Sequence, residues 1–567
     1  MNKKINLALL ALGMAAAIGC QKPNEPDARS TANAGTMSAG ITYAENDGPT
    51  VLGQQLNNPY LLPVMDSAER LLAARGIYPQ AHECDVRVTH LYVKFTPQNE
   101  QELNLLESDT TLNLYDCPMD YEKLVVGTWY REPGLADSSV PTPQYAAVPA
   151  SYQFTNGVGY QVLAQLYIPE QDQQLMGASL LEEWTYMGLL LNEAYSITRP
   201  TDDPGNHNFL LADPGIEGGG GGGSCTGGRI RVHDTRLDQL IGLEGVRVTA
   251  NRWFTTHTGY ADQNGDYCLD GSFDRPADYK IHFRRNGFSV YKNSLVAANI
   301  TESNVSGNHW DRDLSDGLGR FYGTVFRAAY SYHYGDIAGL PRPGRPVVVV
   351  GIFSFEVNQV IVARNDDQTW AFLSGLGMNT IITPRLYVTR FTPGTTNEFG
   401  TDDWYSTTIH EISHTSHFNT LQRNATAFLQ VNNRLRESFS VGVEWLLTSM
   451  EYQNRGIANY GNFGYAPNPS PVFPNVFAYQ YWNEATYDDK YTSLFINLID
   501  DYNEFGQSFP GFDNGTVNDQ VSGYNLGFIQ SFMLLNTMNL STLKAKLSLN
   551  KPTGVTDAQL DLLFDSY

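Results

Sequence analysis

The chain has 567 residues, with 37 Lys and Arg against 60 Asp and Glu and a formal net charge of −23 at pH 7. This length predicts several domains, because one hydrophobic core serves roughly 100 to 200 residues. A hydrophobic content of 42% excludes a largely disordered chain. The acidic balance argues against a nucleic-acid partner, because phosphates need a basic surface.

The N-terminus has the pattern of an export signal. Lys3 and Lys4 precede an apolar run from Ile5 to Ile18, and "AIGC" ends at Cys20. The run is shorter than the roughly 20 apolar residues of a spanning helix, so residues 1–20 are expected to be a signal peptide. "AIGC" resembles a bacterial lipobox, which implies lipidation of Cys20 and anchorage to a membrane of the cell envelope. Residues 21–55 are small and polar and are expected to be a flexible tether.

Residues 56–216 mix helical and strand patterns. "LLPVMDSAERLLAARG" (61–76) and "LEEWTYMGLLLNEAY" (181–195) predict helices, and the alternation in "VRVTHLYVKF" (86–95) predicts a half-buried strand. We expect an α+β domain here, and no catalytic residue types concentrate in it.

Residues 217–227 are expected to be a linker, because Gly218–Gly223 are six consecutive glycines with too much backbone entropy for helix or strand. Short alternating strands with "NG" turns then predict a small β-sandwich over residues 228–305. The ordered segments "LEGVRV", "TGYADQNGDYCL" and "YKIHFRRNGF" resemble the carboxypeptidase regulatory-like domain. That resemblance implies a transthyretin-like sandwich that acts as an accessory without catalysis.

An exported chain can form disulfides, and four cysteines remain beside Cys20. Pairing within domains would join Cys84 to Cys117 and Cys225 to Cys268. Four cysteines allow three connectivities, so the sequence does not choose among them, and free buried thiols are the alternative.

Residues 314–567 are predicted to form an α+β domain in which a small sheet precedes a helical body. "FYGTVFRAAYSYHYG" predicts a helix, and "RPVVVVGIFSF" and "PRLYVTRF" predict strands. Long helices are then expected through "NNRLRESFSVGVEWLLTSMEY" and "YDDKYTSLFINLIDDYN".

The segment "WYSTTIHEISHTSHFNT" contains an H-E-x-x-H motif. Successive helical residues are about 100° apart, so His410 and His414 fall on one stripe and can clamp a metal ion. Such pairs bind Zn²⁺, and Glu411 is then placed to act as general base on a water molecule. His417 would lie about 10 Å along the axis from His410, so it is expected to line the cleft or support the ligands.

A third protein ligand is expected from the next helix. Glu437 and Glu444 are seven residues apart and fall on nearly the same face, so either could complete the site. The pattern resembles the gluzincin metallopeptidases, in which a glutamate before small residues is the ligand. "RESFS" fits that frame with Glu437, although Arg436 stands where Asn is usual. The C-terminal region also resembles a group of uncharacterised Bacteroidetes lipoproteins.

These features predict a membrane-anchored zinc metallopeptidase that acts on a peptide or protein substrate. The alternative is a cell-surface binding or adhesion lipoprotein with a degenerate hydrolase domain. The sequence names neither the substrate nor the residue that would stabilise an oxyanion, and it leaves the choice between Glu437 and Glu444 open.

Overall fold

The computed structural model describes residues 48–77, 85–135, 140–154, 157–172, 181–199, 226–273, 275–293, 296–306, 308–344, 347–350, 353–356, 359–364, 371–373, 385–391, 396–461, 491–507 and 517–567. The expected signal peptide, the glycine run, Cys20, Cys84 and Cys225 lie outside these ranges. The described part contains several separate sheets and helices α1 to α11, which confirms a mixed α and β architecture and is compatible with the expected multidomain α+β fold.

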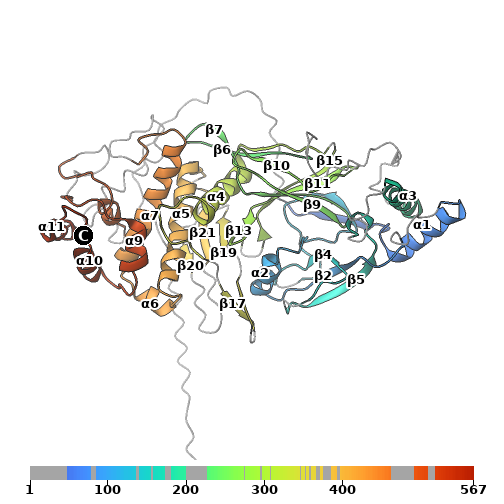
Figure 1. The fold of residues 1–567 in the computed structure, drawn as a ribbon, viewed down its shortest axis with the longest axis horizontal. Helices are drawn as coiled ribbons and strands as arrows, with labels where there is room; N and C mark the ends of the chain where they lie inside the picture. Colours follow the sequence, from blue (N-terminus) through green and yellow to red (C-terminus); the bar gives the residue numbers. More distant parts are fainter. Residues whose placement is uncertain are drawn as a thin grey trace, which may run out of the picture.

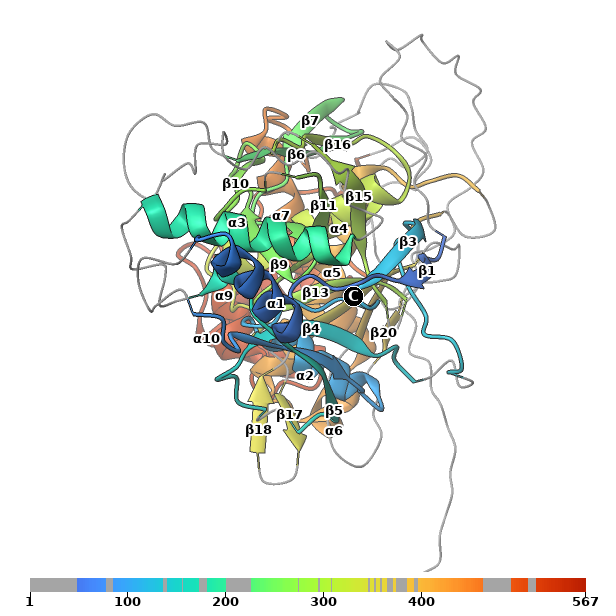
Figure 2. The same ribbon diagram turned by 90° about the vertical axis from the view of Figure 1, so that its right-hand side faces the viewer.

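The N-terminal unit is a three-stranded antiparallel sheet, ordered β4-β2-β5, packed against helices. Its core joins aromatic and aliphatic residues of the sheet to α1 and α3, which lie side by side in Figure 2. The predicted helices and strand are confirmed with shifted ends. The bounds are α1 Leu62–Ala74, β2 His90–Phe95, α2 Glu100–Ser108, β4 Gln144–Pro149, β5 Tyr160–Leu166 and α3 Leu181–Thr198.

The expected tether ends earlier than residue 55. β1 (Val51–Gln55) pairs antiparallel with β3 (Tyr121–Val125), and the Gln55 amide donates to the Asp120 carboxylate over 2.7 Å. The strand forms because its backbone groups find partners about 70 residues further along, a long-range contact that composition does not reveal.

Two four-stranded sheets follow, ordered β10-β6-β16 with β7 beside β6, and β15-β11-β8-β9. They share a core in which Ile230 and Val232 face residues such as Val248 and Ile281. In Figure 1 these sheets lie between the N-terminal unit and the C-terminal helices. The bounds are β6 Gly227–Asp234, β7 Gln239–Gly242, β8 Arg247–Arg252, β9 Thr255–Tyr260, β10 Asp266–Cys268, β11 Ala277–His282, β15 Asn299–Val305 and β16 Arg312–Leu314.

The expected sandwich boundary of 228–305 does not match the sheet topology. β12 (Arg284–Arg285), β13 (Phe288–Asn293) and β14 (Val296–Ala297) leave the sandwich and join the sheet of the C-terminal body. There β13 runs parallel to β19 (Gln359–Arg364), with Val290 opposite Ile361. The linker also ends early, because β6 begins at Gly227.

The C-terminal body combines the sheet β12-β13-β19-β21-β20 with three long helices. β19 and β21 (Arg385–Thr389) are parallel, and β20 (Ala371–Leu373) is antiparallel to β21. α4 (Gly317–Tyr334) and α5 (Thr401–Thr420) pack on this sheet and on each other, and α7 (Asn433–Asn454) packs against α5. α5 therefore lies between the sheet and α7, with both of its long sides covered.

Two sequence expectations fail in this body. "RPVVVVGIFSF" forms two antiparallel strands, β17 (Val347–Val350) and β18 (Phe353–Glu356), instead of one. The helix expected from Tyr487 is only α8 (Leu494–Asn497) within the described residues, because a bend at Ser493 precedes it and a turn follows it. The remaining elements are α6 Ala425–Gln430, α9 Leu526–Phe528, a π-helical turn Ile529–Met533, α10 Leu540–Leu549 and α11 Asp557–Phe564.

The sandwich and the C-terminal body share one hydrophobic core that extends from Ile230 to Tyr567. A buried polar network also joins them: the Arg327 guanidinium donates to Asp234 over 2.6 Å, and the Tyr452 hydroxyl donates to the same carboxylate over 2.8 Å. Arg327 comes from α4 and Asp234 from β6. Neither segment buries its apolar residues alone, so the two segments form one folding unit.

The expected Cys84–Cys117 disulfide is wrong, because Cys117 is a free, buried thiol. It lies just before β3, where burial raises its thiol pKa to about 11. Cys268 is disulfide-bonded, and its expected partner, Cys225, lies outside the described residues.

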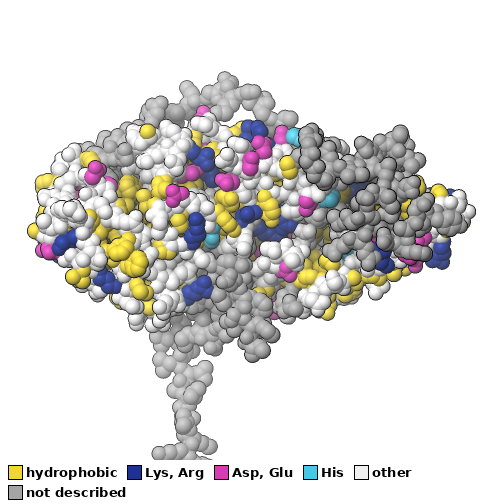
Figure 3. Space-filling view, in the orientation of Figure 1, with side chains coloured by type: hydrophobic (Ala, Val, Ile, Leu, Met, Phe, Trp, Pro, Cys, Tyr) yellow, Lys and Arg dark blue, Asp and Glu magenta, His cyan; other side chains and the backbone are white. Residues whose placement is uncertain are grey.

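No helix in the described ranges is both long and apolar enough to cross a membrane. On the face shown in Figure 3, Lys and Arg side chains are interspersed with Asp and Glu side chains.

Candidate metal centre

The helix that carries the H-E-x-x-H motif is held at its N-terminus by the sandwich. In the turn between β6 and β7, the Thr235 backbone N–H donates to the Thr401 hydroxyl over 2.8 Å, and the Thr401 N–H donates to the Thr235 hydroxyl over 3.0 Å. Arg236 pairs with Asp402 over 2.6 Å. Asp402 and Asp403 also lie in the first turn, where carboxylates stabilise the positive end of the helix dipole. These contacts fix where α5 begins.

α5 is buried on every side from Thr401 to Phe418. Ile409 and Ile412 anchor it in the core, as the sequence predicted. Several of its hydroxyl side chains donate to carbonyls of the helix itself, for example Thr408, which donates to the Trp404 carbonyl over 2.7 Å. Because α5 is enclosed, its charged side chains can contact only the elements packed around it, and α7 provides their partners.

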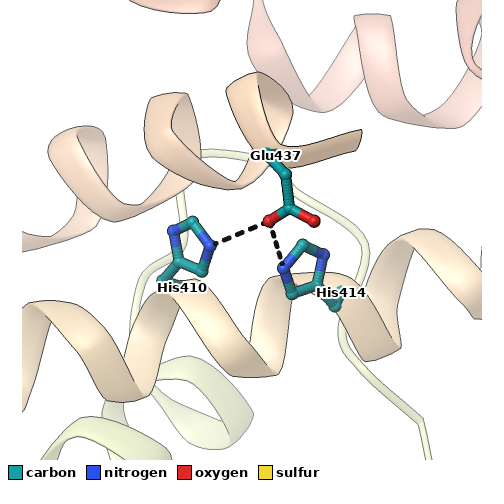
Figure 4. Close-up of side chains that lie close together, drawn as sticks. All are labelled: His410, His414 and Glu437. Carbon is teal, nitrogen blue, oxygen red and sulfur yellow. Dashed lines mark ion pairs between the residues drawn. The ribbon is translucent and has the colours of Figure 1, made fainter. Parts of the chain in front are cut away.

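Figure 4 shows His410 and His414 on α5 pointing toward Glu437 on α7. Glu437 Oε2 lies 3.1 Å from His414 Nε2 and 3.5 Å from His410 Nε2. One potential ligand atom from each residue falls within 4.8 Å of the others, and all three residues are buried. Among the described residues, only this set of three His, Cys, Asp or Glu side chains meets that criterion. The structure therefore favours Glu437 as the third ligand.

The opposite nitrogen of each imidazole also has a partner on α7. Glu444 Oε2 accepts from His410 Nδ1 over 3.0 Å, which fixes the proton on Nδ1, because a carboxylate can only accept. Ser440 Oγ lies 3.0 Å from His414 Nδ1, a hydrogen bond whose direction depends on the tautomer of the ring. Glu437, Ser440 and Glu444 are spaced i, i+3 and i+7 along one face of α7.

This geometry answers the question of the two glutamates. Glu444 contacts Nδ1 of His410, and Glu437 contacts Nε2 of both rings, so the two carboxylates occupy different positions around the imidazoles. A carboxylate that accepts from Nδ1 holds the orientation of the imidazole and makes Nε2 a better electron-pair donor to a metal ion. Glu437, and not Glu444, is therefore the carboxylate that lies with both imidazoles in the set that could hold a metal ion.

Electrostatics within the cluster suit a cation. Burial acts to raise the pKa of Glu437, but His414, His410 and Arg436 hold it well below its ordinary value, so the group is ionised. Burial also acts to lower the pKa of His410, but hydrogen bonds to Glu437 and Glu444 outweigh this effect and raise the pKa to about 10. His410 thus carries the positive charge that balances the carboxylates, in the place where a metal ion could supply it.

Glu411 is fully buried, and its carboxylate is close enough to His410 to raise the pKa of that imidazole. It follows the first imidazole on α5, as the motif requires. It is not one of the three converging side chains, so it stays available for proton transfer.

His417 does not join the ligand set. It packs edge-on against Phe428 and Phe439, with ring centroids 5.7 and 5.3 Å away, and neither of its nitrogens has a hydrogen-bond partner among the residues that the structure describes. Burial lowers its pKa to about 3, so the ring is neutral. His417 is a buried wall residue beside the centre.

Two contributors escaped the sequence analysis. Ser440 was read only as a small residue after Glu437, and Arg436 only as a departure from the gluzincin pattern, although both contact the cluster. The i, i+3 spacing from Glu437 to Ser440 on a helix could have identified the serine. No spacing rule points to Arg436, because neighbouring helical residues diverge by about 100°.

No protein-family model, curated protein or solved structure matches this chain.

Proposed function

We propose that the protein is a zinc-dependent peptidase in which His410, His414 and Glu437 hold the metal and Glu411 is the general base. The observation that carries this proposal is the convergence of the three side chains from two helices within 4.8 Å of one another. Two imidazole nitrogens and one carboxylate oxygen form the donor set of catalytic zinc sites that leave a further position open. The support of both Nδ1 atoms by Glu444 and Ser440 is consistent with this use.

The alternative, a binding lipoprotein with a degenerate hydrolase body, explains these contacts less well. Bringing Glu437 and Glu444 into a buried site requires desolvation of two carboxylates, which costs several kcal/mol per ion without compensation. His410 and Arg436 offset part of that cost, and a metal ion between the three side chains would offset it further.

In the proposed reaction, a bound zinc ion supplies Lewis-acid chemistry, which polarises the scissile carbonyl and lowers the pKa of water. Glu411 takes the proton from the attacking water and delivers it to the leaving amine. His410 and His414 keep their orientation because Glu444 and Ser440 form hydrogen bonds with their Nδ1 atoms. No covalent intermediate with the protein is required.

The finer features of the sequence reading belong to the same proposal. The two four-stranded sheets are compatible with a transthyretin-like accessory unit. We propose that this unit is structural, since its β6–β7 turn holds the start of α5. Lipidation of Cys20 would tether the enzyme to a membrane of the cell envelope.

Metal analysis of the purified protein tests the metal centre. We expect one zinc per chain in the wild type, loss of zinc in His410→Ala, and retention in the matched control His417→Leu on the same helix. Absence of zinc from the wild type after incubation with a zinc salt would refute the proposed metal centre. The binding lipoprotein would then be the remaining hypothesis.

Peptide hydrolysis tests the chemistry separately. Glu411→Gln should keep its zinc and lose roughly 10² to 10⁴-fold in turnover of a peptide library, because only proton transfer is removed. Turnover at the wild-type rate in that variant would remove Glu411 from the mechanism. A zinc-loaded wild type that cleaves no peptide would point to a hydrolase with another substrate.

A further inference from the structure

We propose that Arg436 is a positioning residue that reserves one oxygen of Glu437 for the metal by occupying the other. This inference rests on the proposed metal centre and concerns how that centre is kept open. It assigns a role to the residue at which the chain departs from the gluzincin pattern.

The two oxygens of Glu437 have different partners. Oε2 faces the imidazoles, 3.1 Å from His414 Nε2 and 3.5 Å from His410 Nε2. Oε1 accepts from both Nε and the NH2 nitrogen of Arg436, each over 3.3 Å. The carboxylate is thus divided between a cation of the protein and the metal position.

Arg436 is itself held in place. Its NH2 nitrogen also donates to Asn433 Oδ1 over 2.8 Å, and its guanidinium lies 5.4 Å from the centre of the Phe428 ring. The side chain is only 2% exposed, so water does not compete for the guanidinium. A planar, permanently charged fork buried in this way keeps its direction better than a flexible ammonium would.

This division of the carboxylate limits how Glu437 can bind an ion. A glutamate with two free oxygens can use one or both of them, and the second oxygen fills a coordination position. With Oε1 committed to Arg436, the protein offers three ligand atoms, namely two imidazole nitrogens and one oxygen. Catalytic zinc requires this number, because water and substrate need the remaining position.

The test uses full-length protein loaded with zinc or with cobalt. The visible absorption of protein-bound Co²⁺ weakens when its coordination number rises from four to five. Wild type and Arg436→Gln are compared by zinc competition with a chelator and by the cobalt spectrum. We expect Arg436→Gln to bind zinc about 10 to 100-fold more weakly, the range for loss of a group that supports a ligand. Its cobalt absorption should also fall, since both oxygens of Glu437 become available.

Two further variants guard against a loss of folding. Arg436→Lys keeps the charge without the fork and should give intermediate values for affinity and absorption. Asn433→Ala removes only the exposed amide that orients Arg436 and should shift both readouts slightly in the same direction. Arg455→Gln, a partly exposed arginine at the far end of α7, is the control and should match the wild type.

The outcomes separate this inference from the proposed function. If the wild type binds zinc and the folded Arg436 variants match it in affinity and in the cobalt spectrum, the role of Arg436 is refuted and the peptidase proposal stands. If Arg436→Gln fails to fold, Arg436→Lys and Asn433→Ala decide by the same criteria. If the wild type binds no zinc, the metal centre itself fails.

Discussion

Replacing Glu444 by Gln tests the division of labour between the two glutamates. The substitution preserves shape and removes the negative charge that accepts the hydrogen bond from His410 Nδ1 over 3.0 Å. Hydrogen bonds to charged groups contribute about 1.5 to 3 kcal/mol and neutral ones about 0.5 to 1.5. The difference of about 1 to 2 kcal/mol corresponds to a zinc affinity roughly 5 to 30-fold weaker, because 1.4 kcal/mol is tenfold.

The assay is competition for zinc between the protein and a chromogenic chelator at constant pH. Glu444→Gln should still bind one zinc per chain, since Glu437 remains as the oxygen donor. Ser440→Ala should cost less, because it removes a neutral hydrogen bond of 3.0 Å to His414. Glu437→Gln is the contrasting variant, and it should lose stoichiometric zinc.

Two results would refute this reasoning. A Glu444→Gln protein without zinc would make Glu444 a direct ligand, contrary to its position on Nδ1. An affinity equal to that of the wild type would mean that the carboxylate does not influence the imidazole.

Three other predictions concern stability and reactivity. Burial raises the pKa of Asp519 to about 9, above the value of about 3.9 for an unfolded chain, so the folded state binds more protons and stability falls as pH rises from about 4 to 9. Asp519→Asn should therefore flatten the dependence of the urea midpoint on pH. Asp234→Asn should destabilise the protein by about 3 to 5 kcal/mol in urea unfolding, because Arg327 loses its buried partner at 2.6 Å. Cys117 should react with a maleimide only in denaturant, as shown by peptide mapping, because its thiol is buried.

The pH prediction has a simple control, and each prediction has a contrary outcome. Asp565→Asn, at an exposed position at the end of α11, should leave the pH dependence unchanged. An unaltered slope in Asp519→Asn would show that this carboxyl is ionised in the folded protein. Asp234→Asn with wild-type stability would contradict a buried ion pair, and rapid labelling of native Cys117 would contradict its burial.

Much of the candidate site followed from local pattern. The stripe of His410 and His414 depends only on the pitch of a helix, and the helix runs from Thr401 to Thr420. The helix expected over residues 432–452 is α7, Asn433–Asn454, which carries both candidate glutamates. Periodicity also found α1, α3 and α4, because apolar residues at helical spacing in each of them pack into a core.

Other expectations failed where long-range contacts decide. Residues 51–55 were predicted to belong to the flexible tether because no neighbouring segment of the sequence could form a β-pair with them. They pair instead with a strand some 70 residues away. The segment through β13 read as sandwich because strand alternation is the same in every sheet, and its neighbour in space is β19. The segment from Tyr487 read as a long helix, although within the described residues a bend and a turn confine α8 to four residues.

The sequence by itself determined that two imidazoles and a neighbouring carboxylate lie on one helix, because their spacing is a local property of one segment. Both glutamates lie on the same face of α7, so tertiary structure alone decided which of them contacts the Nε2 atoms and which contacts Nδ1 of His410. That choice depends on how α7 is placed along α5. A shift of α7 by seven residues, about two helical turns, would place Glu444 where Glu437 lies, and packing, which no single segment encodes, sets the register.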